Sequence, residues 1–158
     1  MKTCVVPGSF DPFTLGHLDI VTRASKLFDK VYVAIMINSA KSGTFDFATR
    51  KKIAAASCAE LKNVEVITAD GLLCDLVKAL GAVAIVKGVR NSIDFEYEMN
   101  LAAMNRFIDP SIETVFLPSK SEYSSVSSSF VREMMKYEKP ILGLVHPDAI
   151  KIIDSSKK

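Results

Sequence analysis

The sequence lacks the features that mark membrane, secreted or metal-binding proteins. Its longest apolar stretches, such as Val31–Ile37, are too short to cross a bilayer, and the N-terminus has no long apolar run typical of a signal peptide. The three cysteines form no CxxC pair, and no cluster of Cys, His and Asp has metal-ligand spacing. We therefore expect a cytoplasmic protein whose cysteines are reduced and buried.

The sequence also lacks an excess of charge of either sign. It has 20 Lys and Arg against 18 Asp and Glu, which gives a net charge of +2 and no whole-chain signal for nucleic-acid binding. A local cationic site stays possible. Hydrophobic residues make up 49% of the 158 residues and charged residues 24%, a globular composition. We expect one domain over residues 1–158, with neither a nucleic-acid nor a membrane partner.

Segments typical of strands and helices alternate along the chain about five times. The expected strands are Lys2–Val6, Lys30–Ile37, Val64–Thr68, Ala82–Val86 and Thr114–Leu117. The expected helices are one that begins after Thr14, then Ala48–Leu61, Leu72–Leu80, Asp94–Phe107, Ser128–Tyr137 and Pro147–Ile153. This alternation predicts an α/β fold, a Rossmann-like, doubly wound, five-stranded parallel sheet with helices on both faces.

Three unusual segments follow expected strands of this sheet. Pro7–His17 follows the first strand, Lys87–Arg90 the fourth, and Ser124–Ser129 the fifth. In open α/β sheets, ligands bind beyond the carboxyl ends of the strands, near the point where the strand order reverses. The sequence therefore predicts one site built from all three segments.

The first of these segments, PGSFDPFTLGH, has the properties of a phosphate site. Gly8 lets the backbone approach a ligand closely, and Thr14 can cap the next helix. That cap places Gly16 and His17 in the first helical turn, where free N–H groups favour a phosphate. Thr14 or His17 alone would equally suit an ordinary capped turn, but the whole string favours function. It is neither the GxGxxG nor the GxxxxGK[ST] phosphate loop.

These residues carry a resemblance to a known family. Pro7–His17 resembles the signature of the nucleotidyltransferase superfamily with the [HT]xGH motif, here Thr14–His17. Tyr123–Ser129, YSSVSSS, resembles the superfamily's second motif in the form found in the bacterial phosphopantetheine adenylyltransferases. Two further strings resemble the same family. They are KGVR at Lys87–Arg90 and DFEYE at Asp94–Glu98, which is followed by MNLAAMNR. The resemblance covers nearly the full length, with several motifs in the same order and spacing.

The resemblance implies a reaction. Enzymes of that family transfer the adenylyl group of ATP to 4′-phosphopantetheine, giving dephospho-coenzyme A and pyrophosphate, the penultimate step of coenzyme A synthesis. The acceptor phosphate attacks the α-phosphorus in line. The resemblance further implies Mg2+ carried by ATP rather than by a protein metal site. It also implies a homohexamer, and dephospho-coenzyme A or coenzyme A as a bound product or inhibitor.

The resemblance also assigns roles to individual residues. His17 matches the residue that stabilises the transition state by donating to the α-phosphate, and Arg90 is the candidate for the β- and γ-phosphates. The ATP-binding set it implies is Ser9, Phe10, His17, Gly88, Val89, Arg90, Glu98, Tyr123, Ser124, Ser125, Val126, Ser127, Ser128 and Ser129. The acceptor-binding set is Ser9, Lys41, Leu73 and Lys87.

Several of these residues have a simpler interpretation when taken alone. Lys41 then suits a solvated loop lysine, Glu98 a solvated helix acid, and Leu73 a core residue. Lys87 stands where many relatives carry Arg, so the charge is kept and the bidentate fork is lost.

Two other functions stay open at this stage. One is a different transferase of the superfamily, either a cytidylyltransferase or an enzyme that adenylylates nicotinamide mononucleotide. The YSSVSSS and KGVR–DFEYE blocks argue against it. The other is a regulatory nucleotide-binding module without catalysis. A module of that kind needs no acceptor cations, so Lys41 and Lys87, present together with His17, argue against it.

Overall fold

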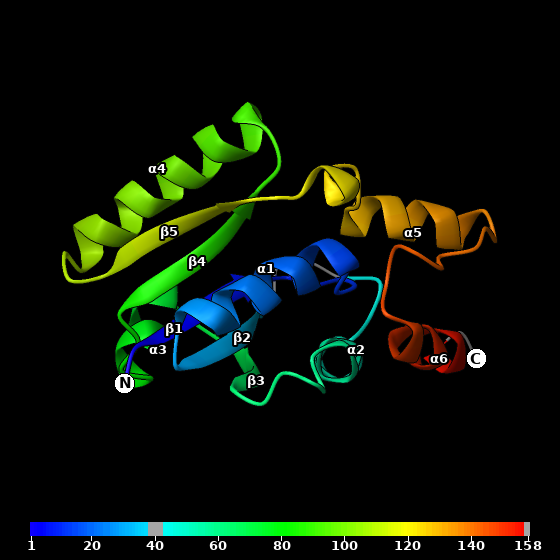
Figure 1. Ribbon diagram of the computed structural model, residues 1–158, viewed down its shortest axis with the longest axis horizontal. Coiled ribbons are helices and arrows are strands. Elements are labelled where there is room, and N and C mark those ends of the chain that lie inside the picture. The colour runs from blue at the N-terminus through cyan, green and yellow to red at the C-terminus, as the bar shows by residue number, and fades with distance from the viewer. Residues whose placement is uncertain (38–42, 157–158) are drawn as a thin grey trace.

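A five-stranded sheet in the order β3-β2-β1-β4-β5 forms the centre of the computed structural model, which describes residues 1–37 and 43–156 (Figure 1). All of its strand pairs are parallel. The strands are β1 Thr3–Gly8, β2 Lys30–Met36, β3 Val64–Ala69, β4 Ala84–Val89 and β5 Glu113–Pro118. The helices are α1 Leu15–Leu27, α2 Phe47–Ser57, α3 Leu73–Ala79, α4 Ser92–Ile108, α5 Ser128–Lys136 and α6 Pro147–Ser156, with a short 3-10 helix η1 at Ser121–Tyr123. The predicted α/β fold is confirmed.

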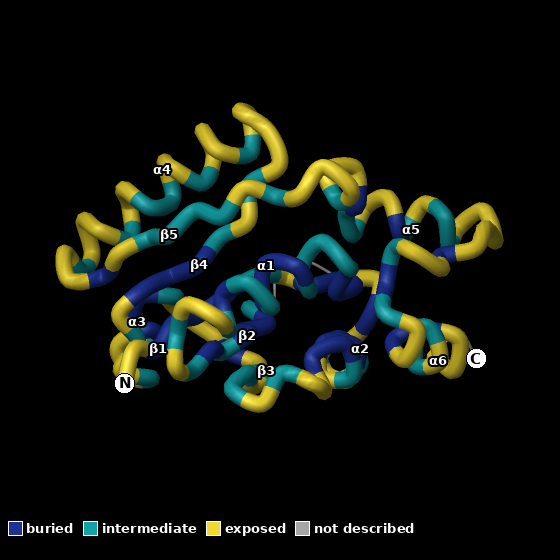
Figure 2. Tube along the Cα trace, viewed as in Figure 1, coloured by how far each residue is buried: buried dark blue, intermediate teal, exposed yellow. Residues whose placement is uncertain are grey.

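Helices cover both faces of the sheet, because successive strand residues point to opposite sides. Cys4 and Val6 of β1 belong to a core shared with residues of α1, α2, α5 and α6. Val5, between them, belongs to a second core with Cys74 and Val77 of α3. Figure 2 shows the central strands buried, whereas α4 is mostly exposed. None of the helices in the described part of the chain is long and apolar enough to cross a membrane.

The sheet has its switch point between β1 and β4. The chain goes from β1 outward to β2 and β3, then returns to the other side of β1 for β4 and β5. β1 and β4 pair only at Cys4–Ala84 and Val5–Ile85. Beyond these residues the two strands separate toward their carboxyl ends, so a crevice opens where a ligand site is expected.

Several predicted boundaries are wrong at this end of the sheet. β1 continues through Pro7 to Gly8, and β4 continues through Lys87 to Val89, although both strands were expected to end earlier. Their outer neighbours hold them in register, since Pro7 lies opposite Ala34 of β2 and Val89 opposite Pro118 of β5. Pro7 is tolerated because β1 has no partner on its β4 side there.

The helix boundaries also differ from their predicted ranges, by one residue at some ends and by up to four at others. α4 begins at Ser92, before the expected Asp94, because the Asn91 side chain caps it by accepting the Asp94 N–H. α2 ends at Ser57, before the expected Leu61, where the Cys58 N–H makes the last helical hydrogen bond. The short helix η1 lies between β5 and α5, where no element was predicted.

Candidate functional site

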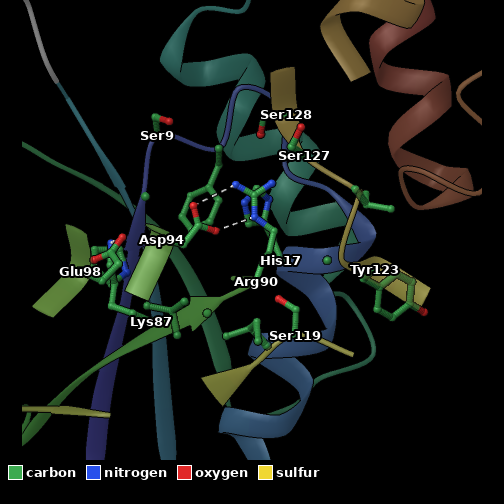
Figure 3. Close-up of a pocket in the computed structure, with 18 of the residues that line it drawn as sticks. Ser9, His17, Lys87, Arg90, Asp94, Glu98, Ser119, Tyr123, Ser127 and Ser128 are labelled. Carbon is green, nitrogen blue, oxygen red and sulfur yellow. Dashed lines mark hydrogen bonds and ion pairs between the residues drawn. The ribbon is translucent and has the colours of Figure 1, made fainter. Parts of the chain in front are cut away.

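A cavity of about 470 Å³ lies in the crevice between β1 and β4 (Figure 3). This volume is in the range of small-molecule sites. All three unusual segments of the sequence contribute to its walls, as predicted for a site at the switch point. Val89, Ser124 and Ser125 are not among the described residues that line it. The other residues implied for ATP do line it, namely Ser9, Phe10, His17, Gly88, Arg90, Glu98, Tyr123, Val126, Ser127, Ser128 and Ser129.

A second cavity, of about 640 Å³, adjoins the first. Leu73 and Lys87, both implied for the acceptor, line this cavity together with Ser9. Lys41, the remaining residue of that set, lies outside the described residues. The two cavities share part of their walls, at Pro7, Gly8, Ser9, Lys87 and Arg132. The molecule therefore has two adjoining compartments.

His17 is held in one orientation by the cap of α1. Thr14 is the N-cap, and the His17 N–H donates to its Oγ1 at 3.3 Å. The Thr14 backbone N–H donates in return to Nδ1 of His17 at 3.0 Å. Because Nδ1 accepts this bond, the ring proton belongs on Nε2, which is the nitrogen left to donate to a ligand. The capping interaction thus selects the tautomer suited to a phosphate.

Aromatic rings hold the imidazole from the other side. The Phe10 ring meets it edge-on at 5.0 Å between centroids, and the Phe13 ring lies at 5.4 Å. Phe10 has a φ of 45°, a left-handed conformation that is uncommon outside glycine. Strain of this kind persists where the surrounding packing demands it, often at functional sites. Phe10 thus lines the cavity as a support for His17.

Burial lowers the pKa of His17 to about 4, and the positive charges of Arg90 and Lys87 act in the same direction. The imidazole is therefore neutral at pH 7. A neutral ring with its proton on Nε2 still donates a hydrogen bond and is not repelled by the two cations beside it. An incoming phosphate could accept from Nε2 and would add negative charge beside the two cations.

Two glycines shape the floor of the crevice. A β-carbon on Gly8 would lie 2.8 Å from the Phe10 ring, and one on Gly88 would lie 2.7 Å from Cγ1 of Ile20. Both positions exclude a side chain because neighbouring side chains already occupy the space. Gly8 was predicted to leave room for a ligand. In the structure, its missing side chain makes room for Phe10.

α4 supplies a carboxylate to each of the two cations at the end of β4. The Lys87 Nζ lies 3.1 Å from Oε1 of Glu98, and the Arg90 Nε lies 2.8 Å from Oδ2 of Asp94 (Figure 3). Asp94 and Glu98 are one helical turn apart, so they face the same side. Glu98 is no solvated acid, because its side chain is only 16% exposed. Its Oε2 is buried without a hydrogen-bond partner among the described residues.

The serine run forms the N-terminus of α5. Ser127 is the N-cap, and its Oγ accepts the Phe130 N–H at 3.1 Å. The Ser128 hydroxyl donates to the Pro12 carbonyl at 2.7 Å, which ties α5 to the segment between β1 and α1. The hydroxyls of Ser124 and Ser129 are engaged within the chain as well, with the Ser121 carbonyl and with Arg132. The helix N-terminus itself still offers free N–H groups to an anion.

Sequence reasoning missed several residues of the site. Arg132 lines both cavities and donates to the Asp11 carbonyl at 2.7 Å and to the Ser129 Oγ at 3.1 Å. Its signal was its position one helical turn after Ser128, on the same face of α5. Asp94 was named only as part of an expected helix and of the DFEYE string, with no role of its own, yet it binds Arg90.

Comparisons with known proteins show the family of the chain. The model of the Cytidylyltransferase-like family matches residues 5–134. A phosphopantetheine adenylyltransferase of Clostridium botulinum (strain Alaska E43 / Type E3) is 47% identical over 95% of this chain and 94% of its own. One from Symbiobacterium thermophilum is 47% identical over 93% and 91%, and one from Clostridium tetani is 45% identical over 100% and 98%.

A solved structure from Vibrio parahaemolyticus, provisionally assigned as a nicotinate-nucleotide adenylyltransferase, has a TM-score of 0.73 over 98% of this chain and 93% of its own. At 20% identity it shows the fold alone.

The sheet with its switch-point crevice, the capped His17 and the family match define a nucleotidyltransferase of the Cytidylyltransferase-like class. Within that class the relatives above share nearly half of their residues with this chain over almost its full length. The chain belongs to the phosphopantetheine adenylyltransferase family.

Proposed function

We propose that the protein transfers the adenylyl group of ATP to 4′-phosphopantetheine, giving dephospho-coenzyme A and pyrophosphate in coenzyme A biosynthesis. The observation that carries the proposal is the pair of adjoining cavities that share Ser9, Lys87 and Arg132. A transferase needs two substrates to meet at one point, whereas a nucleotide-binding regulator needs only one compartment. The near full-length similarity to enzymes of this name supports the choice of acceptor.

The transfer proceeds in line. An oxygen of the acceptor phosphate forms a bond to the α-phosphorus of ATP, while the bond from that phosphorus to the bridging oxygen of the β-phosphate breaks. Pyrophosphate leaves with the electron pair. The acceptor is already an anion, so no strong general base is required. The chain contributes positioning and stabilisation of the charge that develops.

His17 acts on the transferring phosphoryl group. Its Nε2–H donates to an α-phosphoryl oxygen as negative charge grows there. The donor is fixed before the reaction, because the Thr14 N–H holds Nδ1 and the rings of Phe10 and Phe13 pack on the imidazole. A donor that needs no reorganisation lowers the barrier more than a mobile one does.

Cations bring the two anionic substrates together. Arg90 binds the β- and γ-phosphates in the first cavity, with the free N–H groups at the start of α5. Lys87 binds the acceptor phosphate where the cavities join. Arg132 is a third cation at that junction, and among the described residues it pairs with no carboxylate. Without these cations, the phosphates of the two substrates would repel each other.

A magnesium ion carried by the triphosphate fits these residues. Both carboxylates that line the first cavity, Asp94 and Glu98, already bind cations of the chain. In the described part of the chain, no group of three or more His, Cys, Asp or Glu residues could hold a metal ion. Phosphate oxygens and water would therefore be its ligands, and the ion would screen the charge of the leaving pyrophosphate.

Further properties follow the family resemblance. We propose a homohexamer, which is supported by the apolar surface that α4 leaves exposed. The residues are Ile93, Phe95, Tyr97, Met99, Met104, Phe107 and Ile108. Dephospho-coenzyme A is the bound product, and coenzyme A, which differs from it by one phosphate, is an inhibitor of the same cavities. The three cysteines are free thiols, which supports a cytoplasmic location.

The experiment supplies purified protein with ATP, magnesium and 4′-phosphopantetheine and measures pyrophosphate together with dephospho-coenzyme A. Equimolar release of both products supports the proposal, and a chelator should abolish it. ATP binding without release of pyrophosphate from any acceptor would instead support the regulatory module.

A further inference from the structure

An ion pair buried beside the second cavity has no part in the transfer described above. Asp11 follows β1, and Arg50 lies in the first turn of α2. These residues are 8% and 5% exposed, and the Arg50 Nε lies 3.3 Å from Oδ1 of Asp11. Burying two charges is costly, and such a pair is weak evidence for stability on its own. The hydrogen bonds of the two residues indicate a role other than stability.

The pair ties together two chain segments that are far apart in the sequence. The two carboxylate oxygens of Asp11 accept the N–H groups of Thr44 and Phe45, at 2.8 and 2.9 Å. The Arg50 Nε donates to the Phe45 carbonyl at 2.8 Å, and its Nη1 donates to the Ser9 carbonyl at 3.2 Å. Asp11 and Arg50 thus both bind the segment Gly43–Phe45, and Arg50 also binds Ser9.

Gly43 gives an independent sign that this packing is specific. A β-carbon there would overlap the Arg50 guanidinium and would lie 2.8 Å from Oδ2 of Asp11. The backbone of Gly43 therefore rests directly against the ion pair, and only glycine leaves that space free. A pair that merely filled the core would place no such demand on a neighbouring segment.

The ion pair and the residues that it binds lie on the side of the second cavity. Asp11, Gly43, Thr44 and Arg50 all line the second cavity, and none of them is among the described residues that line the first. Ser9 lines both cavities. A change in the ion pair therefore acts first on the wall of the second cavity, and it reaches the first cavity only through Ser9 and Arg132, which line both.

We propose that Asp11 and Arg50 form a positioning pair for the acceptor. The pair holds the wall formed by Gly43 and Thr44 at a set distance from Ser9, and so aligns a phosphorylated acceptor with the nucleotide in the neighbouring cavity. Neither residue touches the reacting atoms. The inference rests on the proposed function, because it assumes that the second cavity takes the acceptor.

The test is the Arg50→Lys variant, which keeps the charge and loses the guanidinium that reaches two carbonyls at once. We expect the KM for 4′-phosphopantetheine to rise about tenfold, as for one lost charge-assisted hydrogen bond, with a lower kcat. The KM for ATP should stay within about twofold of wild type. Arg106→Lys is the matched control, since Arg106 pairs with Glu113 on the surface and should change neither constant.

Asp11→Asn provides a second variant of nearly the same shape, and it should show the same acceptor-selective loss. The double variant should be little worse than either single one, because the two residues act as a unit. Equal losses for both substrates, no loss for either, or failure of both single variants to fold would overturn the inference. Failure of the wild-type protein to use 4′-phosphopantetheine would overturn the proposed function instead.

Discussion

At the scale of the residue, His17 shows how the local environment selects a chemical role. Its Nδ1 is engaged by the Thr14 N–H, so the proton stays on Nε2. Burial, with Arg90 and Lys87 nearby, keeps the ring neutral at pH 7. Before a phosphate binds, a protonated ring would be repelled by the nearby cations. The neutral ring avoids this repulsion and can still donate to the phosphate.

Replacing His17 with Ala should therefore slow turnover while ATP binding is kept. Loss of one preorganised donor to a developing charge typically costs about 10²–10³ in kcat, and we expect a loss of this size. The Kd for ATP, measured by calorimetry, should change by less than about threefold. His146, the other histidine, lines neither of the two cavities, so His146→Ala is the control. Equal losses in ATP affinity and turnover would make His17 a binding residue only.

The lowered pKa of His17 also predicts how stability depends on pH. The unfolded chain takes up a proton near pH 6.5, whereas the folded chain resists it down to about pH 4. The contribution of His17 is therefore complete above pH 6.5 and is lost as the pH falls toward 4, by up to about 3 kcal/mol. Urea unfolding at pH 7 and pH 4.5 measures this loss. The His17→Asn variant should lose less stability than wild type over this interval, and an equal loss would contradict the prediction.

The candidate site could be predicted from sequence only where a motif marked it. The strings around His17 and Ser127–Ser129 located the first cavity. Arg50 was missed because Lys51 and Lys52 follow it and are exposed, which hides one buried cation among solvated ones. A signal was present nonetheless. Arg50, Ile53, Ala54 and Ser57 form the buried stripe of α2, at helical spacing.

At the scale of the element, α4 has an unusual position. It has no buried residue in the described chain, yet Asp94 and Glu98 on one of its faces bind the cations at the end of β4. The sequence predicted α4 as a helix but not its ion pairs with Arg90 and Lys87. Acids early in a helix are expected from the helix dipole alone. β4 ran past its predicted end because register with β5 fixes strand length, and single-sequence patterns do not contain register.

Asp94→Asn should weaken ATP binding through Arg90. The ion pair is partly exposed, at 36% and 29%, so its loss is worth at most about 1 kcal/mol, or about fivefold in the KM for ATP. The KM for the acceptor should be unchanged, because Asp94 does not line the second cavity. Glu96→Gln, an exposed acid on the same helix, is the control. A larger effect on the acceptor than on ATP would show that Arg90 serves the other substrate.

At the scale of the whole molecule, the exposed apolar side chains of α4 are the feature a single chain leaves unexplained. Phe107 is 89% exposed and Met104 61%. Large apolar side chains that are exposed together on one helix usually mark an interface. Because Asp94 and Glu98 of α4 pair with Arg90 and Lys87, an interface through α4 would also steady the site.

The protein should therefore assemble through α4. Sedimentation should give a mass well above the 17.3 kDa of one chain, with six chains as the expected number. Phe107→Glu should shift the distribution toward smaller species. Leu142→Glu, which changes an apolar residue that is 73% exposed and lies outside α4, should not. A wild-type monomer, or equal effects of both variants, would contradict this interface.

We propose above all that the second cavity selects a phosphorylated pantetheine as the acceptor of an adenylyl group. The most direct test compares kcat/KM for 4′-phosphopantetheine, nicotinamide mononucleotide and glycerol 3-phosphate, each with ATP and with CTP, in one product-resolved assay. We expect kcat/KM for ATP with 4′-phosphopantetheine to exceed that of every other pair by at least about a hundredfold. Comparable or greater turnover with another acceptor, or with CTP, would contradict it.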